Sequence, residues 1–84
     1  MNAKLEFIPN NQIWKTQENY SGNVLIIEET GEIVPVFYDD FEGFYSASVM
    51  IHAFYLDSVT IEVSSNTLPG LLFNLKLITL AGVN

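Results

Sequence analysis

The feature that most constrains the fold is a pair of β-branched and aromatic runs, residues 23–29 and 32–38, separated by residues 30–31, Thr-Gly. Such runs around a glycine-containing turn predict a β-hairpin. If residues 30–31 form a two-residue loop, Ile27 pairs with Val34. Both faces of the hairpin are apolar, with Leu25, Ile27, Val34 and Val36 on one and Val24, Ile26, Ile33 and Phe37 on the other. Each face therefore needs a cover, which a helix, a second sheet or a second subunit can provide.

Shorter signals flank this hairpin. Pro35 has no amide hydrogen to donate to a strand ladder, so its strand is predicted to lie at a sheet edge or to contain a bulge. Upstream, residues 5–8 predict a short strand that the turn-forming residues 9–11 bring to an end. Residues 12–16 predict a brief second strand, and residues 19–23 predict another turn.

Residues 39–57 are compatible with two structures. A helix here begins with Asp39 or Asp40 as its N-cap, which is favourable against the helix dipole. Its apolar face is made by Phe41, Phe44, Ser48, Ile51 and Tyr55. A strand is the alternative, because Gly43 and two serines lower the helix propensity. We favour the helix over the strand.

The remaining segments predict strands joined by a turn. Residues 58–63 alternate as a strand, residues 64–70 turn the chain, and residues 71–80 predict a closing strand. The whole chain, residues 1–84, is thus predicted to be a single α+β domain with a small antiparallel sheet of about five strands and one helix. A small all-β barrel or sandwich is the alternative if residues 44–56 are extended.

The charge balance is one-sided. The chain has ten acidic residues against three lysines (Lys4, Lys15 and Lys76) and no arginine, which makes the net charge −7. Between Thr16 and Leu75 there are nine carboxylates and no cation. Such a field attracts a basic protein and keeps the molecule in solution. It also argues against direct binding of nucleic acid, because that binding depends on cationic contacts with phosphates.

Acids and aromatic rings are interleaved over residues 28–45. Aromatic rings offer contact area and cation–π attraction to Lys and Arg, while carboxylates offer pairing and steering. We therefore predict a partner-binding site from these residues: Glu28, Glu29, Glu32, Tyr38, Asp39, Asp40, Phe41, Glu42 and Tyr45. The alternative is structural, with the same carboxylates capping and guarding the ends of an exposed hairpin.

Catalytic signals are weak throughout the chain. His52 is the one histidine and lies in an apolar stretch, which is typical of a structural residue. The five glycines are spread singly, so no phosphate-binding loop is present, and there is no cysteine. The carboxylates of residues 39–42 lack the pattern of a calcium loop. We expect a protein that is not an enzyme and that has no metal site and no cofactor.

The two terminal segments were compared with the patterns of secretory signals and membrane helices, which bear on cellular location. Residues 1–14 have neither an apolar run nor a small-residue cleavage site, so a secretory signal is not expected. The longest weakly charged run, residues 64–84, is interrupted by Pro69 and Lys76 and falls short of the roughly 20 apolar residues of a membrane helix. We expect a cytoplasmic protein without a membrane partner.

Two functions agree with these features. The first is a non-enzymatic acidic inhibitor that docks on the basic nucleic-acid-binding site of another protein. Small immunity proteins and phage-encoded anti-defence proteins act in this way, and the likeness is one of size and charge. The alternative is a structural or assembly subunit that forms a homo-oligomer through apolar sheet faces. A hydrophobic fraction of 49% and a positive mean hydropathy favour it.

Overall fold

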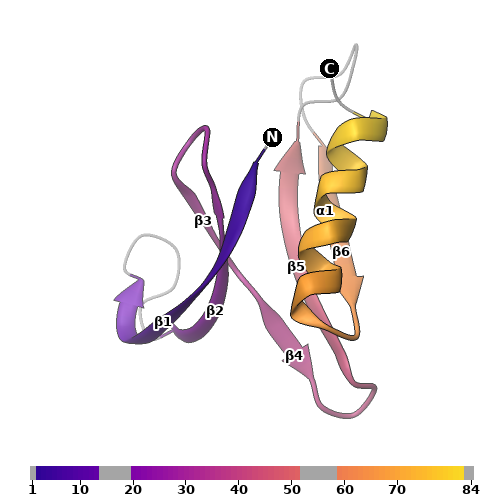
Figure 1. Ribbon diagram of the computed structural model, residues 1–84. Helices are drawn as coiled ribbons and strands as arrows, with labels where there is room; N and C mark the ends of the chain where they lie inside the picture. Colours follow the sequence, from indigo (N-terminus) through magenta and orange to yellow (C-terminus); the bar gives the residue numbers. More distant parts are fainter. Residues whose placement is uncertain (1, 14–19, 52–58, 83–84) are drawn as a thin grey trace.

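Two small antiparallel sheets and one helix make up the described part of the chain, residues 2–13, 20–51 and 59–82 of a computed structural model (Figure 1). The first sheet has the strand order β1-β2-β3 and the second has the order β4-β5-β6. The elements are β1 (Ala3–Ile13), β2 (Tyr20–Ile27), β3 (Glu32–Pro35), β4 (Phe37–Asp39), β5 (Phe44–Ile51), β6 (Val59–Ser65) and α1 (Leu68–Gly82).

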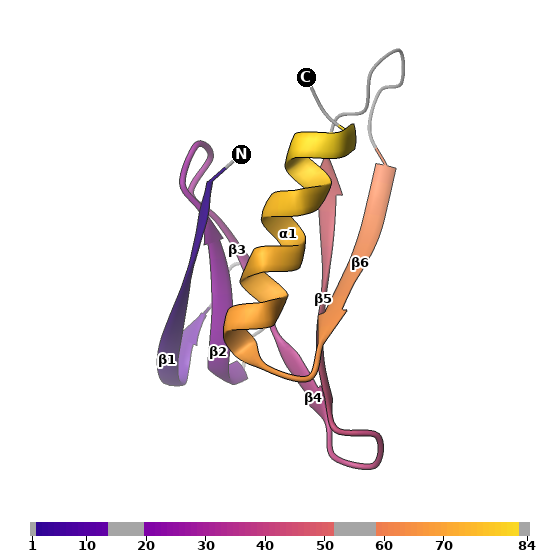
Figure 2. The same ribbon diagram turned by 45° about the vertical axis from the view of Figure 1, so that its right-hand side comes forward.

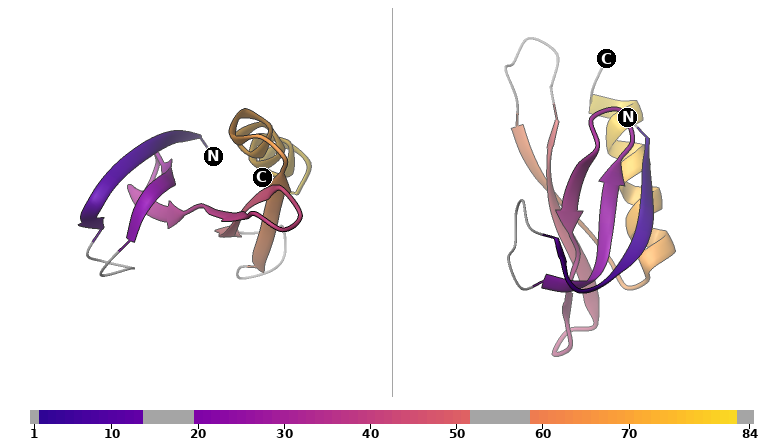
Figure 3. Two further views of the ribbon diagram at one scale, coloured as in Figure 1. Left: turned by 90° about the horizontal axis from the view of Figure 1, so that it is seen from below. Right: turned by 90° about the vertical axis from the view of Figure 1, so that its left-hand side faces the viewer.

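The α+β class is confirmed, but the arrangement differs from the predicted single sheet of about five strands. The described residues form six strands in two sheets, and the chain crosses from one sheet to the other at Val36, between β3 and β4. The two sheets diverge from this crossing (Figure 3). Helix α1 lies across the opening between them and contacts β6, β5 and β1 (Figure 2). The helix therefore closes a space that two three-stranded sheets cannot close alone.

A single hydrophobic core is shared by both sheets and the helix. Its fully or nearly buried members are Ala3, Leu25, Ile27, Val34, Val36, Ala47, Val49, Val63, Leu71 and Leu75. One predicted hairpin face, formed by Leu25, Ile27, Val34 and Val36, is confirmed as a core face. The molecule is only 17 Å across in its thinnest direction, measured over Cα atoms, which leaves room for about two layers.

The predicted hairpin forms with a different register. Ile27 pairs with Glu32 rather than with Val34, so the loop has four residues, 28–31, instead of two. The Gly31 amide donates a hydrogen bond to the Ile27 carbonyl oxygen at 2.7 Å, and Gly31 has φ +75°, a conformation that glycine adopts without strain. Because the register moved by two residues, an even number, the side chains of β2 and β3 kept their predicted faces, whereas Phe37 belongs to β4 in the second sheet.

The edge position of the proline strand is confirmed, since β3 is the outer strand of its sheet. The predicted chain stop at residues 9–11 is wrong, because β1 continues past Pro9 to Ile13. An irregularity in the β1–β2 register between Ile8 and Ile13 accommodates that segment on an edge strand.

The predicted turn at residues 19–23 is also corrected, because β2 already begins at Tyr20. Of the predicted strand 12–16, residues 12 and 13 belong to β1, and the other three lie outside the described residues.

The predicted helix over residues 39–57 is wrong, and the alternative strand is right for residues 44–51. Ala47 and Val49 are buried, whereas Ser48 and Met50 are exposed, which is the two-residue period of a strand. The apparent helical spacing combines an apolar residue of the β4–β5 turn, Phe41, with the apolar residues of strand β5. The rest of the predicted helix, including His52, lies outside the described residues.

Helix α1 replaces the predicted closing strand at residues 71–80. Thr67 is its N-cap: the side-chain Oγ1 accepts a hydrogen bond from the Gly70 amide at 3.0 Å. Pro69 lies in the first turn, where a missing amide hydrogen has no consequence. Leu71 and Leu75, one turn apart, are almost completely buried against the sheets. Burial of this leucine stripe overrides the apparent alternation of residues 71–80.

Replacing Thr67 with alanine tests the N-cap. The change removes the acceptor for the Gly70 amide and should lower the free energy of unfolding by about 1 kcal/mol. Chemical denaturation monitored by circular dichroism measures this value. Thr67→Ser is the matched control, because it keeps the hydroxyl and should remain within about 0.5 kcal/mol of the parent protein. Equal losses in both variants would contradict the assignment of the cap.

Candidate partner-binding surface

The structure divides the predicted binding residues between two turns. The β2–β3 turn and its margin carry Glu28, Glu29 and Glu32, while the β4–β5 turn and its margins carry Tyr38, Asp39, Asp40, Phe41, Glu42 and Tyr45. These turns lie at opposite ends of the molecule (Figure 1). The acids that are close together in the sequence therefore do not form one patch.

At the β2–β3 turn, Glu29 has a structural contact. Its two carboxylate oxygens accept hydrogen bonds from the Asn2 backbone amide at 2.9 and 2.8 Å, which ties the start of β1 to the turn. These hydrogen bonds lower the pKa of the Glu29 carboxyl. For Glu29, the structure thus supports the alternative that the acids brace the hairpin.

The β4–β5 turn is built in the same way as the first turn. Asp39 pairs with Phe44, so the loop again has four residues, and Gly43 at its end has φ +79° and donates to the Asp39 carbonyl oxygen at 2.7 Å. The Asp39 carboxylate accepts hydrogen bonds from the Phe41 and Glu42 amides at 2.9 and 3.3 Å. Asp39 therefore braces the turn with one oxygen. The Phe41 side chain at the tip is 91% exposed.

Tyr38 and Tyr45 lie on the other face of the second sheet from Asp39. They are directly opposite in the β4–β5 pair, and their ring centroids are 4.6 Å apart. Tyr45 is partly buried and packs against the hydrophobic core. Because side chains alternate along a strand, the adjacent Asp39 and Phe44 project to the opposite side. The two tyrosines therefore do not share a surface with these acids.

The sequence alone did not identify the surface on that opposite side. Helix α1 and the core cover the side of the second sheet that bears Ala47, Val49 and Val63, so the alternate residues face away from the core. We call this the acidic sheet face, formed by Phe37, Asp39, Glu42, Phe44, Ser46, Met50, Glu62 and Ser64. All of these residues except Ser46 are exposed.

Glu62 is the carboxylate of this face that the sequence did not predict. It lies on β6, directly opposite Ser48 of β5, and is 20 or more residues away from the acids of the β4–β5 turn. The signal that points to it is the alternation of residues 58–63, which places Glu62 on the polar side of its strand. That signal becomes useful only when residues 44–51 are also treated as a strand.

An open pocket of about 340 Å³ lies on the acidic sheet face. Three carboxylates, one aromatic ring and two hydroxyls line it: Asp39, Glu42, Glu62, Phe44, Ser46 and Ser64. Lys4 pairs with Glu6 at 3.2 Å on β1, and no lysine within residues 2–13, 20–51 and 59–82 forms an ion pair with a carboxylate of this pocket. The pocket thus offers uncompensated negative charge beside an aromatic ring. This chemistry suits a guanidinium or ammonium group.

Two further findings concern the described residues as a whole. Within them, no group of three or more acidic or histidine side chains is arranged to hold a metal ion. None of their helices is long and apolar enough to cross a membrane.

Comparisons with known proteins do not assign the chain to a family. No family model matches it, and neither the curated proteins nor the solved structures include a significant match.

Proposed function

We propose that this chain is a non-enzymatic binding module whose acidic sheet face captures a basic surface of another protein. The observation that supports it is the lining of the pocket, to which Asp39, Glu42 and Glu62 contribute together with Phe44. Carboxylates from three different segments converge there: the end of β4, the β4–β5 turn and β6. Glu28, Glu29 and Glu32 at the far turn are not part of the proposed site.

The partner's side chains follow from the chemistry of this face. Arginine fits better than lysine, because its planar guanidinium donates to two carboxylate oxygens and also stacks on an aromatic ring. Phe37 and Phe44, both exposed on the same face, offer such rings beside the carboxylates. Each exposed ion pair contributes little, on the order of 0.2–1 kcal/mol, so several arginines must bind together.

Inhibition is the role that this surface supports best. A protein that binds nucleic acid presents clustered cations to the phosphates, and an acidic domain that covers them competes with the polyanion for the same charges. The net charge of −7 steers the encounter and excludes nucleic acid from the module itself. An immunity protein or a phage anti-defence protein would act in this way.

Neutralising two carboxylates of the pocket should weaken the capture of cations. In the variant Asp39→Asn with Glu62→Gln, the Kd for a fluorescent arginine-rich peptide should rise about tenfold at about 0.05 M salt, since each removed contact is worth up to about 1 kcal/mol. Asn keeps an oxygen that can brace the turn. Fluorescence anisotropy measures the Kd, and a matched titration shows whether the protein releases DNA from the same peptide.

The matched control changes the same number of charges at the other end of the molecule. Glu28→Gln with Glu32→Gln should alter the Kd by less than about twofold, because these residues are distant from the pocket. If both double variants lose affinity equally, the peptide responds to net charge alone and the proposed site is wrong. Affinity that does not change between about 0.05 and 0.3 M salt would contradict the electrostatic mechanism as well.

The alternative of an assembly subunit is favoured by a different observation. Phe73 and Leu77 are exposed large hydrophobic residues on α1, at 61% and 46%. They lie outside the acidic sheet face and have no part in the capture of a basic partner.

A further inference from the structure

Helix α1 is apolar on all sides, although the molecule covers only one of them. Lys76 is its one charged residue, and large apolar residues occur in every turn. Leu71 and Leu75 face the core, while Phe73 and Leu77, four residues apart, lie together on the outward side. A helix that is hydrophobic all round is normally buried all round. We call Phe73, Lys76 and Leu77 the helix face.

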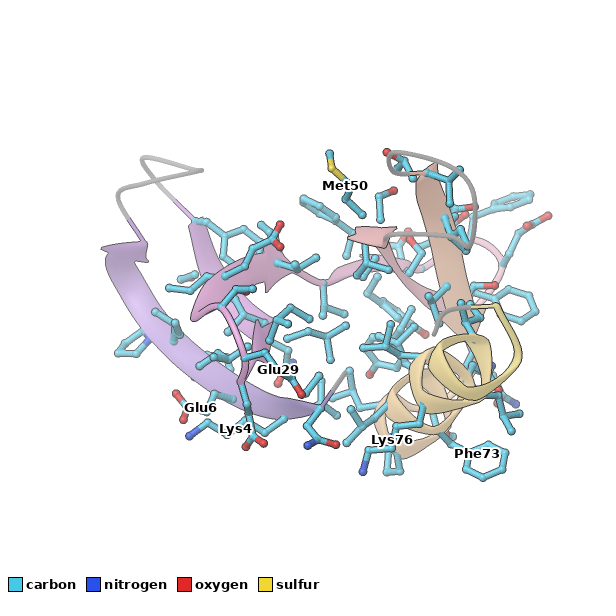
Figure 4. All side chains as sticks on the ribbon, turned by 90° about the horizontal axis from the view of Figure 1, so that it is seen from above. Lys4, Glu6, Glu29, Met50, Phe73 and Lys76 are labelled. Carbon is cyan, nitrogen blue, oxygen red and sulfur yellow. The ribbon has the colours of Figure 1, made fainter. Side chains whose placement is uncertain are left out.

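The helix face and the acidic sheet face complement one another in charge. Helix α1 contains no acid, and its Lys76 is exposed, as Phe73 and Leu77 are. The acidic sheet face combines carboxylates with exposed apolar side chains, of which Met50 is 60% exposed. Met50 lies on one side of the molecule, and Phe73 and Lys76 lie on the opposite side (Figure 4). Both faces thus have exposed apolar side chains, and each carries the charge of the sign that the other lacks.

We propose that copies of this chain associate head to tail, with the helix face of one copy seated on the acidic sheet face of the next. Phe73 and Leu77 would cover the apolar side chains, and Lys76 would approach the carboxylates. The contact joins two different surfaces on opposite sides of the protomer, so it leaves a free face at each end and continues into an open chain or a ring. This inference does not depend on the proposed function, and a basic partner would compete for the same sheet face.

The dependence on salt concentration distinguishes self-association from the capture of a basic partner. Two copies that each carry a charge of −7 repel one another at long range, and only the short-range apolar contact and Lys76 oppose this repulsion. Self-association should therefore strengthen by at least about fivefold between about 0.02 and 0.3 M NaCl, as screening removes the repulsion. Capture of an arginine-rich peptide should weaken over the same range. Either proposal can consequently fail while the other holds.

A pair of blocked variants tests the geometry. Phe73→Asp blocks the helix face and Met50→Asp blocks the acidic sheet face, and each variant alone should stay monomeric in sedimentation velocity at about 0.3 M NaCl. When mixed, they should form a species of two chains, since each retains the face that the other has lost. The parent protein should grow beyond two chains as its concentration rises.

The controls test whether each variant is folded and whether the copies associate through a helix-to-helix contact instead. Phe7→Asp adds the same charge at an exposed residue of β1 that belongs to neither face, and it should associate like the parent protein. Circular dichroism and the thermal midpoint confirm that each variant is folded. A parent protein that remains monomeric at all concentrations overturns the proposal. So does a dimer that stops at two chains and still forms with Met50→Asp, because that result indicates a helix-to-helix contact.

Discussion

Replacing Leu71 with alanine is expected to lower the free energy of unfolding by about 2–5 kcal/mol, which is the range for removing a large side chain from a packed core. Leu71 is fully buried, and it belongs to the helix that closes the opening between the two sheets. Its removal leaves a cavity in the hydrophobic core, and a chain of 84 residues has little surplus stability to absorb the loss. Urea denaturation monitored by circular dichroism measures the change.

Leu77→Ala is the matched control for this prediction. It removes the same atoms from the same helix, but from a side chain that is 46% exposed and faces outward. The loss should stay below about 1 kcal/mol, because less apolar area leaves the folded state. The experiment is done at low protein concentration and low salt, so that self-association does not contribute. Similar losses at both positions would mean that α1 does not pack through Leu71.

Replacing Tyr20 with phenylalanine should lower the free energy of unfolding by about 1–3 kcal/mol. The Tyr20 hydroxyl lies within donor distance of the carbonyl oxygens of Asn23 and Val36, and it accepts a hydrogen bond from the Val36 amide at 3.2 Å. Val36 is buried at the point where the chain crosses between the sheets. The ring of Tyr20 also packs edge-on against Phe37 at 5.7 Å, and phenylalanine preserves that contact. The loss therefore reports the hydroxyl alone.

The same variant has a pH signature. Burial raises the pKa of Tyr20 above its ordinary value of 10.0, because the phenolate is poorly solvated there. The folded state thus holds the proton more tightly than the unfolded state. This contribution to stability is complete below pH 10.0 and is lost as the pH rises above it. The difference in stability between the parent protein and Tyr20→Phe should consequently narrow in alkaline solution.

Tyr38→Phe serves as the control, since the Tyr38 side chain is 55% exposed. Its free energy of unfolding should stay within about 0.5 kcal/mol of the parent value. A gap between Tyr20→Phe and the parent protein that is constant from neutral pH to above pH 10.0 would contradict the role given to the hydroxyl.

Local patterns predicted the first hairpin well and the second poorly. The apolar runs on both sides of Gly31 predicted the β2–β3 hairpin and its core face correctly, but the loop is two residues longer than predicted and the second run is divided between β3 and β4 of the other sheet. The second turn has the same construction, with Gly43 at the end of a four-residue loop. The spacing of Asp39 and Gly43 contained this information. This turn signal is ambiguous, because an aspartate followed by apolar residues is also typical of the start of a helix.

For a related reason, the sequence patterns predicted a helix where strand β5 forms and a strand where helix α1 forms. Residues 44–51 and residues 71–80 both alternate imperfectly, so periodicity alone does not separate a strand from a helix there. The discriminating signals are at the ends of the segments: Thr67 followed by Pro69 marks a helix start, while Gly43 marks a turn. End signals involve one or two residues, so a longer apolar pattern easily obscures them.

The candidate site shows where sequence proximity fails. Glu32 and Asp39 are seven residues apart, yet β3 and β4 carry them to turns at opposite ends of the molecule. Glu62 is distant in the sequence and lines the pocket with Asp39. Strands separate residues by more than 3 Å per position, and cross-strand pairing unites residues that are far apart in the chain. Composition predicted acidic and aromatic chemistry, but pairing selected which residues share a face.

The sequence by itself determined the apolar core face of the first hairpin, the edge position of Pro35 and the excess of negative charge, because each depends on composition or on short-range pattern. Only the tertiary structure decided that the strands form two sheets, that residues 68–82 are the helix, and that an acidic face and an apolar helix face lie on opposite sides. The physical reason is that these outcomes depend on which surfaces bury one another, and burial is a property of the whole chain.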